Sequence, residues 1–302
     1  MEWLRTPRGQ VLLGSGVVAL VAVGIVGYVL LAGARADATP NVPPLERIGK
    51  GRAQDVPGLD HRNPDVRLRA VRKVKDTLDP NTAQVLLTKM TGDEDETVRL
   101  AAAEELASLK DRGVLAEVLR IRRRGPTDLD RRLAAIVLGG VASDQEEKDV
   151  YEMTNDPDPV VRRSAARAIG NMRDKERWKP ILAGMLRNQD ASVRFEAART
   201  AKSAFDQAWS IPLQEEILHG SEDPQMRRSS IIGLGMLASP AAVEALGRWL
   251  TLEPEADLRK DALSQIATVP GQASRAILER AASEDSVELV RSHAAALLKK
   301  LK

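Results

Sequence analysis

The sequence predicts an all-α fold, a right-handed α-solenoid of about eight stacked two-helix repeats preceded by one transmembrane helix. Eight arginines recur at intervals of 31 to 33 residues. A period of this length is typical of solenoids, whose units bury their apolar faces only by stacking on one another. Aromatic residues make up only 3% of a chain that is 43% apolar, which suits thin helical layers. The eight marker arginines are Arg67, Arg99, Arg131, Arg162, Arg194, Arg227, Arg259 and Arg291.

The N-terminal region predicts a membrane anchor. After a short tail at 1–10, the segment 11–34 contains no charged residue, and a helix of this length would extend roughly 36 Å, enough to cross a bilayer core. We expect an uncleaved, single-pass transmembrane helix. A cleaved signal peptide is the alternative, because Ala34-Arg35-Ala36 resembles a cleavage site. An apolar run this long favours the anchor.

The charges around this segment bear on its orientation. Arg5 and Arg8 precede it, and Arg35, Arg47 and Lys50 follow it. The positive-inside count is therefore nearly balanced. Because the basic tail is short, we expect it to stay in the cytoplasm. This orientation predicts that the repeats are extracytoplasmic, on a protein of the cytoplasmic membrane.

Residues 35–62 are rich in proline and glycine and lack helical periodicity, so we expect a linker between anchor and repeats. A segment packed as a cap on the first repeat is the alternative.

The repeats at 63–302 share a helical pattern around each marker arginine. An aliphatic residue usually precedes the arginine, and a small residue follows three positions later. In the fourth unit, Val161, Ala165, Ala168 and Ile169 fall on one helix face. Each arginine therefore lies in the second helix of a pair. Shorter apolar stretches predict the first helices at 83–90, 114–122, 181–187, 213–218, 242–250 and 273–281.

At this level of detail the chain resembles HEAT repeats, in particular the short variety found in phycobilisome bilin lyases. The resemblance is carried by the segments 94–109, 156–172 and 190–204 and extends over 63–302. It implies a solenoid that acts as a protein-binding scaffold or assembly factor. In such repeats the marker arginine resembles a ladder rung, and we expect its guanidinium to bind the acidic turn of its own or the adjacent unit.

Two groups of basic residues are candidates for electrostatic contact with a partner. Arg122, Arg123 and Arg124 form a dense run, while Arg163 and Arg167 add positive charge to a second helix. If second helices line the concave surface, that surface is basic and favours a membrane-associated partner with an acidic surface, or an anionic lipid headgroup. A solvated face balanced by turn carboxylates is the plainer interpretation.

The composition argues against several other functions. The net charge is only +2, so no strong field draws the chain to nucleic acid, and we expect Trp178, Trp209 and Trp249 to pack in the core or to cover helix ends. There is no cysteine, and the three histidines are far apart and followed by Arg62, Gly220 and Ala294. The paired His-Glu steps that hold two irons in HEAT-type hydroxylases are therefore missing.

No serine-nucleophile or phosphate-binding motif is present. We expect no catalytic residue, metal, cofactor, small-molecule substrate or nucleic-acid ligand. A bilin-lyase-like enzyme and a nucleic-acid-binding HEAT protein are the alternatives.

Overall fold

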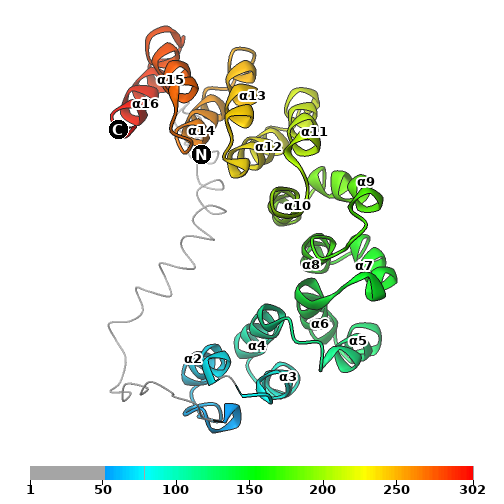
Figure 1. Cartoon of the computed structure of the whole chain (residues 1–302). Helices are drawn as coiled ribbons and strands as arrows, with labels where there is room; N and C mark the ends of the chain where they lie inside the picture. The colour runs from blue at the N-terminus through cyan, green and yellow to red at the C-terminus, as the bar shows by residue number, and fades with distance from the viewer. Residues whose placement is uncertain (1–51, 78, 302) are drawn as a thin grey trace, which may run out of the picture. The chain divides into compact units, whose positions relative to one another are not determined.

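The computed structural model describes residues 52–77 and 79–301, all within one compact unit, Gly49–Lys302. In this part of the chain there are fifteen α-helices and no strand, so the predicted all-α class is confirmed. Successive helices alternate between two rows of an arc (Figure 1). We call the two rows the inner helices, on the concave side, and the outer helices, on the convex side.

The inner helices carry the marker arginines and are the predicted second helices. Their bounds are α2 (Pro64–Val74), α4 (Glu96–Leu109), α6 (Asp128–Val141), α8 (Pro159–Ile169), α10 (Ala191–Ala204), α12 (Pro224–Leu237), α14 (Ala256–Ile266) and α16 (Glu288–Leu298).

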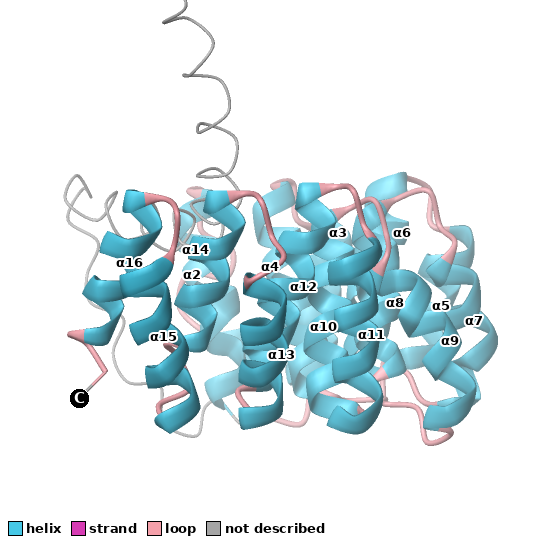
Figure 2. Ribbon diagram, turned by 90° about the horizontal axis from the view of Figure 1, so that it is seen from above, coloured by secondary structure: helices cyan, strands magenta, loops and turns pink. Residues whose placement is uncertain are grey.

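The outer helices are the predicted first helices, with one more that the sequence pattern did not indicate, α7. Their bounds are α3 (Thr82–Gly92), α5 (Leu115–Arg124), α7 (Glu147–Thr154), α9 (Lys175–Leu186), α11 (Gln207–Gly220), α13 (Pro240–Leu250) and α15 (Gln272–Glu284). Seen from above, the helices of both rows run roughly parallel or antiparallel to one another (Figure 2). Within residues 52–77 and 79–301, seven units are complete pairs, and only the 3₁₀ helix at 53–55 precedes α2.

Acidic residues begin most inner helices, as their positive N-terminal ends favour. The side chains of Asp95, Asp158, Asp190 and Asp223 each accept a hydrogen bond from a backbone N–H in the first turn of the helix that follows. Proline is the first residue of α2, α8 and α12, where its missing N–H costs nothing. An Asn-Pro step therefore sets the start of α2, and Asp-Pro steps set the starts of α8 and α12.

The core lies between the two rows. Val161, Ala165, Ala168 and Ile169 of α8 are all buried, as the periodicity predicts. The small residue three positions after each marker arginine is buried in every repeat, from Ala70 to Ala294. Trp178 and Trp249 are buried in outer helices. They belong to the core, as expected, and cannot stack on nucleic-acid bases.

The start of the solenoid differs from the expected linker at 35–62. Residues 53–55 form the short 3₁₀ helix η2 (Ala53–Asp55), and Ala53, Val56 and Leu59 are buried. The backbone N–H of Ala53 donates to the Asp79 carboxylate at 2.6 Å. The end of the predicted linker is therefore a cap on α2 and α3, because three apolar side chains spaced three apart cover the open end of the first repeat.

The predicted membrane segment 11–34 lies outside the described residues, as does the rest of the predicted linker up to residue 51. Among residues 52–77 and 79–301, no helix combines the length and the apolar character needed to cross a bilayer.

Candidate functional site

Each marker arginine first binds its own turn. In seven of the eight repeats its Nη1 donates to the backbone carbonyl oxygen six residues earlier, at 2.5 to 3.0 Å. Arg99 is the exception, since its Nε donates to Met90 O at 2.8 Å. The guanidinium therefore closes the loop between the outer and inner helix of a repeat.

The same arginine then binds the next repeat, most often the side chain 26 residues later. Arg67 donates to both carboxylate oxygens of Asp93, and Arg259 donates to both oxygens of Asp285 at 2.8 and 2.9 Å. Arg227 Nε lies 3.1 Å from Glu253 Oε2, and Arg162 contacts Asn188 at 3.4 Å. This arrangement is the ladder that the resemblance implied, with each rung joining two repeats.

The other rungs depart from the pattern where the turn residue changes. Gly125 has no side chain to offer Arg99, which binds Asp130 instead. Arg194 has no carboxylate within ion-pair distance in the described chain and donates to Ser229 Oγ at 2.7 Å and to three backbone carbonyls. Because this buried guanidinium is surrounded by neutral acceptors, burial lowers the pKa of Arg194. Arg131 and Arg291 bind carboxylates of their own helices, Asp128 and Glu288.

The run Arg122–Arg124 divides into residues with different environments. Arg122 donates to Asp156 at 2.6 Å, with both side chains largely buried, and Arg123 binds both oxygens of Asp149 at 2.8 and 2.6 Å. Asp156 precedes Arg162 by six residues, so Arg122 occupies the place that Arg131 would take in a regular ladder. Of these three arginines, only Arg124 is exposed and makes no ion pair within the described residues.

Arg163 and Arg167 lie on α8, in the inner row, whereas Arg122–Arg124 end the outer helix α5. The structure therefore does not unite the predicted partner-contact residues in one patch. Neither Arg163 nor Arg167 makes an ion pair or side-chain hydrogen bond with the described residues, although both are half-buried. They are the pair of predicted contact residues that the fold leaves available on the inner face.

Glu104 of α4 lies near enough to these two arginines for their charges to affect its pKa. Glu104 is an exposed residue, but partial burial of its carboxyl raises the pKa of Glu104, and the positive charges of Arg72, Arg163 and Arg167 oppose that rise. The inner helix α6 lies between α4 and α8 (Figure 1). Arg72, Glu104 and Arg167 each lie five residues after a marker arginine, so all three lie on the concave side of the inner row.

Two glycines of α6 allow the inner helices α4, α6 and α8 to pack closely against one another. Residues 133–142 of α6 and its cap are all buried. A Cβ on Gly140 would lie 2.1 Å from Ala107 O of α4, and one on Gly139 would lie 2.9 Å from Ser164 O of α8. The backbones of α4 and α8 thus approach α6 closely from its two sides. The role of Gly139 and Gly140 was not predicted, although a Gly-Gly pair inside a helix is a signal of close backbone contact.

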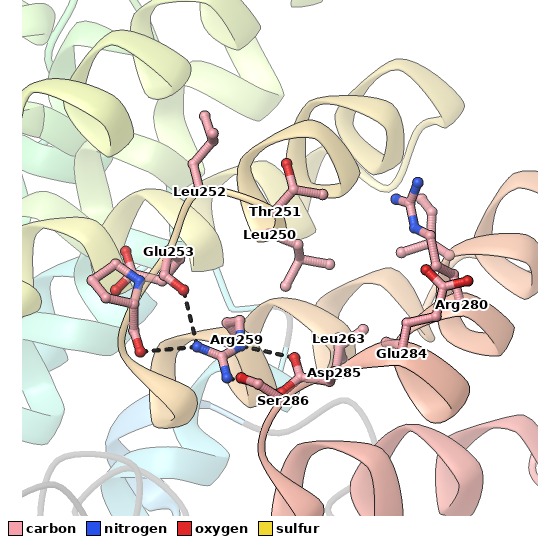
Figure 3. A pocket seen from close by; sticks show the side chains of 13 residues that line it. Leu250, Thr251, Leu252, Glu253, Arg259, Leu263, Arg280, Glu284, Asp285 and Ser286 are labelled. Carbon is pink, nitrogen blue, oxygen red and sulfur yellow. Dashed lines mark hydrogen bonds and ion pairs between the residues drawn. The ribbon is translucent and has the colours of Figure 1, made fainter.

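The structure also contains a cavity between the seventh and eighth repeats. An open cavity of about 530 Å³ is lined by residues of α13, α14 and α15 and by the loop after α13. Figure 3 shows Arg259 in its floor, between Glu253 and Asp285. Because Arg259 binds both Asp285 oxygens and the Glu253 carbonyl, these polar groups are already satisfied. We interpret the cavity as the space around a ladder rung.

No group of three or more His, Asp or Glu side chains in the described ranges is arranged to hold a metal ion. The three histidines remain apart, and His293 Nε2 lies 2.8 Å from Ser264 Oγ on the neighbouring inner helix.

Comparison with known proteins agrees with this architecture. The family model for HEAT repeats matches residues 56–139, 147–208 and 211–299. No curated protein matches the chain.

Among solved structures, the complex of CpcE and CpcF of phycocyanin lyase from Nostoc sp. is 16% identical, with a TM-score of 0.45, covering 88% of this chain and 100% of that chain. The YibA protein of Escherichia coli is 17% identical, with a TM-score of 0.45 and coverage of 80% and 90%. Human deoxyhypusine hydroxylase in complex with glycerol is 17% identical, with a TM-score of 0.35 and coverage of 79% and 91%. Identities this low transfer neither an activity nor a partner to this chain.

Proposed function

Because the chain belongs to the HEAT-repeat family, we propose that it is a membrane-tethered, non-catalytic scaffold or assembly factor that binds a protein partner along its solenoid. Stacked repeats expose a long continuous surface, and such surfaces are suited to recognition. The repeat arginines then have a structural role, which keeps the surface in register.

One observation carries the proposal of a binding surface on the concave side. Two adjacent arginines of α8, Arg163 and Arg167, have no ion pair in the described part of the chain, while most arginines around them do. A folded protein gains nothing from leaving half-buried cations unpaired. We therefore interpret them as groups held for an acidic partner.

The tether is the segment 11–34, acting as a single-pass anchor in the cytoplasmic membrane. The solenoid then faces the extracytoplasmic side, joined to the anchor by the Pro- and Gly-rich stretch that precedes η2. A scaffold held in this way would meet partners that are themselves membrane-associated. An enzymatic reporter fused to the C-terminus tests the orientation: activity only in the cytoplasm would contradict it.

The proposal is tested by affinity purification of the full-length, detergent-solubilised chain from its native cells, followed by mass spectrometry. A variant lacking residues 1–48 serves as the matched control, because it removes the anchor and keeps the cap at 53–59. We expect a discrete membrane complex with the full-length chain and its loss or depletion with the variant. Recovery of nucleic acid alone, or of no protein partner, would contradict the scaffold role.

A further inference from the structure

An exposed aromatic side chain lies on the inner face. Phe195 is 40% exposed although it directly follows the buried Arg194. Its position relative to the marker arginine is the same as that of Arg163 on α8 and of Arg228 on α12. Because equivalent positions on parallel stacked helices face the same way, Phe195 lies on the concave side between these two arginines.

The charges around Phe195 are unbalanced. One turn further along each helix come Arg167 on α8, Arg199 on α10 and the half-buried Ile232 on α12. Arg199 pairs with Glu196 and Arg228 with Asp261, whereas Arg163, Arg167 and the exposed Lys202 have no ion pair within the described residues. The surface of α8, α10 and α12 thus combines an apolar centre with surplus positive charge.

We infer that this surface, which we call the Phe195 patch, binds an acidic protein segment that places an apolar side chain against the Phe195 ring. The inference rests on the proposed scaffold function and names the chemistry of its partner. Exposed aromatic and arginine side chains contribute most of the binding energy at protein interfaces, and an unpaired guanidinium can bind a carboxylate through two hydrogen bonds.

A protein segment suits the patch better than other anionic ligands. Single-stranded nucleic acid requires several aromatic platforms along a basic track, whereas this surface offers one exposed phenylalanine, and the acids Glu196 and Asp261 pair with two of its arginines, Arg199 and Arg228. A bilayer surface is flat and cannot follow the concave row of helices (Figure 1). Charge complementarity and the apolar centre together therefore favour an acidic peptide.

Glu104 marks the other edge of the patch and supplies a sharp test. Glu104 lies on the same concave side as Arg163 and Arg167, whose positive charges oppose the rise of its pKa, and it makes no ion pair in the described chain. An acidic ligand would be repelled by this negative charge. Removing the charge while keeping the shape, with Glu104→Gln, should therefore tighten binding of an acidic segment, by about two- to fivefold for a charge that keeps contact with solvent.

The probe is a random 12-residue peptide library, selected on the full-length chain in detergent micelles. The expected result is enrichment of peptides that are rich in Asp and Glu around an apolar residue. The affinity of an enriched peptide is then measured by fluorescence anisotropy. Phe195→Ala and Arg163→Glu/Arg167→Glu should each weaken binding at least about tenfold, the loss that hot-spot residues produce.

Two variants of the outer row are matched controls. Tyr151 of α7 is 55% exposed, and Arg124 at the end of α5 is exposed without an ion pair in the described ranges. Tyr151→Ala and Arg124→Glu should leave the affinity unchanged within twofold. Circular dichroism verifies that every variant is folded, and Glu104→Gln tests the patch by a gain of affinity that misfolding cannot produce.

Enrichment of basic peptides, no enrichment, or binding that is indifferent to the Phe195 patch would overturn the inference. So would binding to phosphatidylglycerol vesicles or single-stranded RNA that requires the patch while acidic peptides do not bind. A native partner that still co-purifies with the Phe195→Ala/Arg163→Glu/Arg167→Glu variant would overturn the patch and leave the scaffold function intact. The absence of any native partner would instead contradict the scaffold function itself.

Discussion

The turn residue six positions before a marker arginine joins three parts of the ladder. The backbone carbonyl of Asp285 accepts from Arg291, its carboxylate binds Arg259 of the preceding repeat, and it also accepts from the backbone N–H of Val287. Asp93, Asp156, Asn188, Ser221 and Glu253 make the same contact with the N–H two residues later. A polar residue at this position therefore shapes its own turn, and at Asp93, Asn188, Glu253 and Asp285 it also receives the marker arginine of the preceding repeat.

Asp285→Asn tests one rung through its pH dependence. The hydrogen bonds from Arg259 hold the pKa of Asp285 below its ordinary value, although burial opposes them. A carboxyl whose pKa is depressed on folding stabilises the protein above its unfolded pKa of about 3.9, and this stability is lost as the pH falls. The variant should cost about 1 to 3 kcal/mol at pH 7 and clearly less at pH 3, because the contribution declines as the pH falls from the unfolded pKa through the lower folded pKa; urea denaturation measures both.

Glu284→Gln is the control for this experiment, because Glu284 is exposed and makes no ion pair among the described residues. Its stability should match that of the original chain at both pH values. A loss for Asp285→Asn that is equally large at pH 3 would show that the rung does not depend on the charge of the carboxylate.

The arginines at the end of α5 should also differ in how much each contributes to the stability of the protein. Arg122 binds Asp156 with only 17% of either side chain exposed, whereas Arg124 is exposed and unpaired within the described chain. We expect Arg122→Ala to cost about 1 to 2 kcal/mol and Arg124→Ala to stay within about 0.5 kcal/mol of the original chain. Thermal unfolding followed by circular dichroism measures both. Equal effects would mean that the Arg122–Asp156 contact contributes no stability.

At the scale of the helix, α6 is set apart by its two glycines. Because Gly140 lies against the backbone of Ala107, a methyl group there must push α4 and α6 apart. Gly140→Ala should therefore destabilise the protein by about 3 kcal/mol or more. Gly184 of α9 is exposed with no atom within 4 Å of an added Cβ, so Gly184→Ala should stabilise by about 0.5 to 1 kcal/mol.

These two substitutions are compared by chemical denaturation. They make the same chemical change in two helices, so a difference in sign isolates the close approach of helices from intrinsic helix propensity. Destabilisation of similar size at both positions would contradict the role assigned to Gly140.

The helices themselves differ in how well the sequence could predict them. Marker arginines, small residues and Asp-Pro turns repeat in register, so the inner helices follow from periodicity and capping. The outer helix α7 was missed because it has only 8 residues and follows the short 3₁₀ helix η4 (Asp144–Glu146). The cap at 53–59 was predicted only as the alternative to a linker, because a Pro- and Gly-rich segment has no periodicity, although its apolar residues are buried at the start of the first repeat.

The candidate site was harder to predict for a related reason. Sequence reasoning found Arg163 and Arg167 from their charge, but it grouped them with Arg122 and Arg123, which are engaged in ion pairs. Which arginine finds a carboxylate depends on the register between neighbouring repeats, since partners lie 26 to 34 residues away. Phe195 was missed because an aromatic residue inside a helix is usually buried, and only stacking of the repeats shows which face is exposed.

At the scale of the whole molecule, the solenoid is held together by contacts between neighbouring repeats. Every rung joins a repeat to its own turn or to the next repeat, with no rung to a more distant unit among the described residues. Stability in such a chain is close to a sum of repeat and interface contributions. Damage to one central rung should therefore remain local.

The substitution Arg162→Ala tests this prediction, because it removes a rung in the middle of the arc. Arg162 donates to the carbonyls of Asp156 and Pro157 in its own turn and contacts Asn188 of the next. Hydrogen exchange read by mass spectrometry should rise in α7–α10 and stay unchanged in α2, α3, α15 and α16, with a lower melting temperature. Arg173→Ala is the control, because Arg173 is 94% exposed and should alter neither measurement. Faster exchange along the whole chain would instead mean that the repeats unfold as one cooperative unit, and an unchanged melting temperature would mean that this rung contributes nothing.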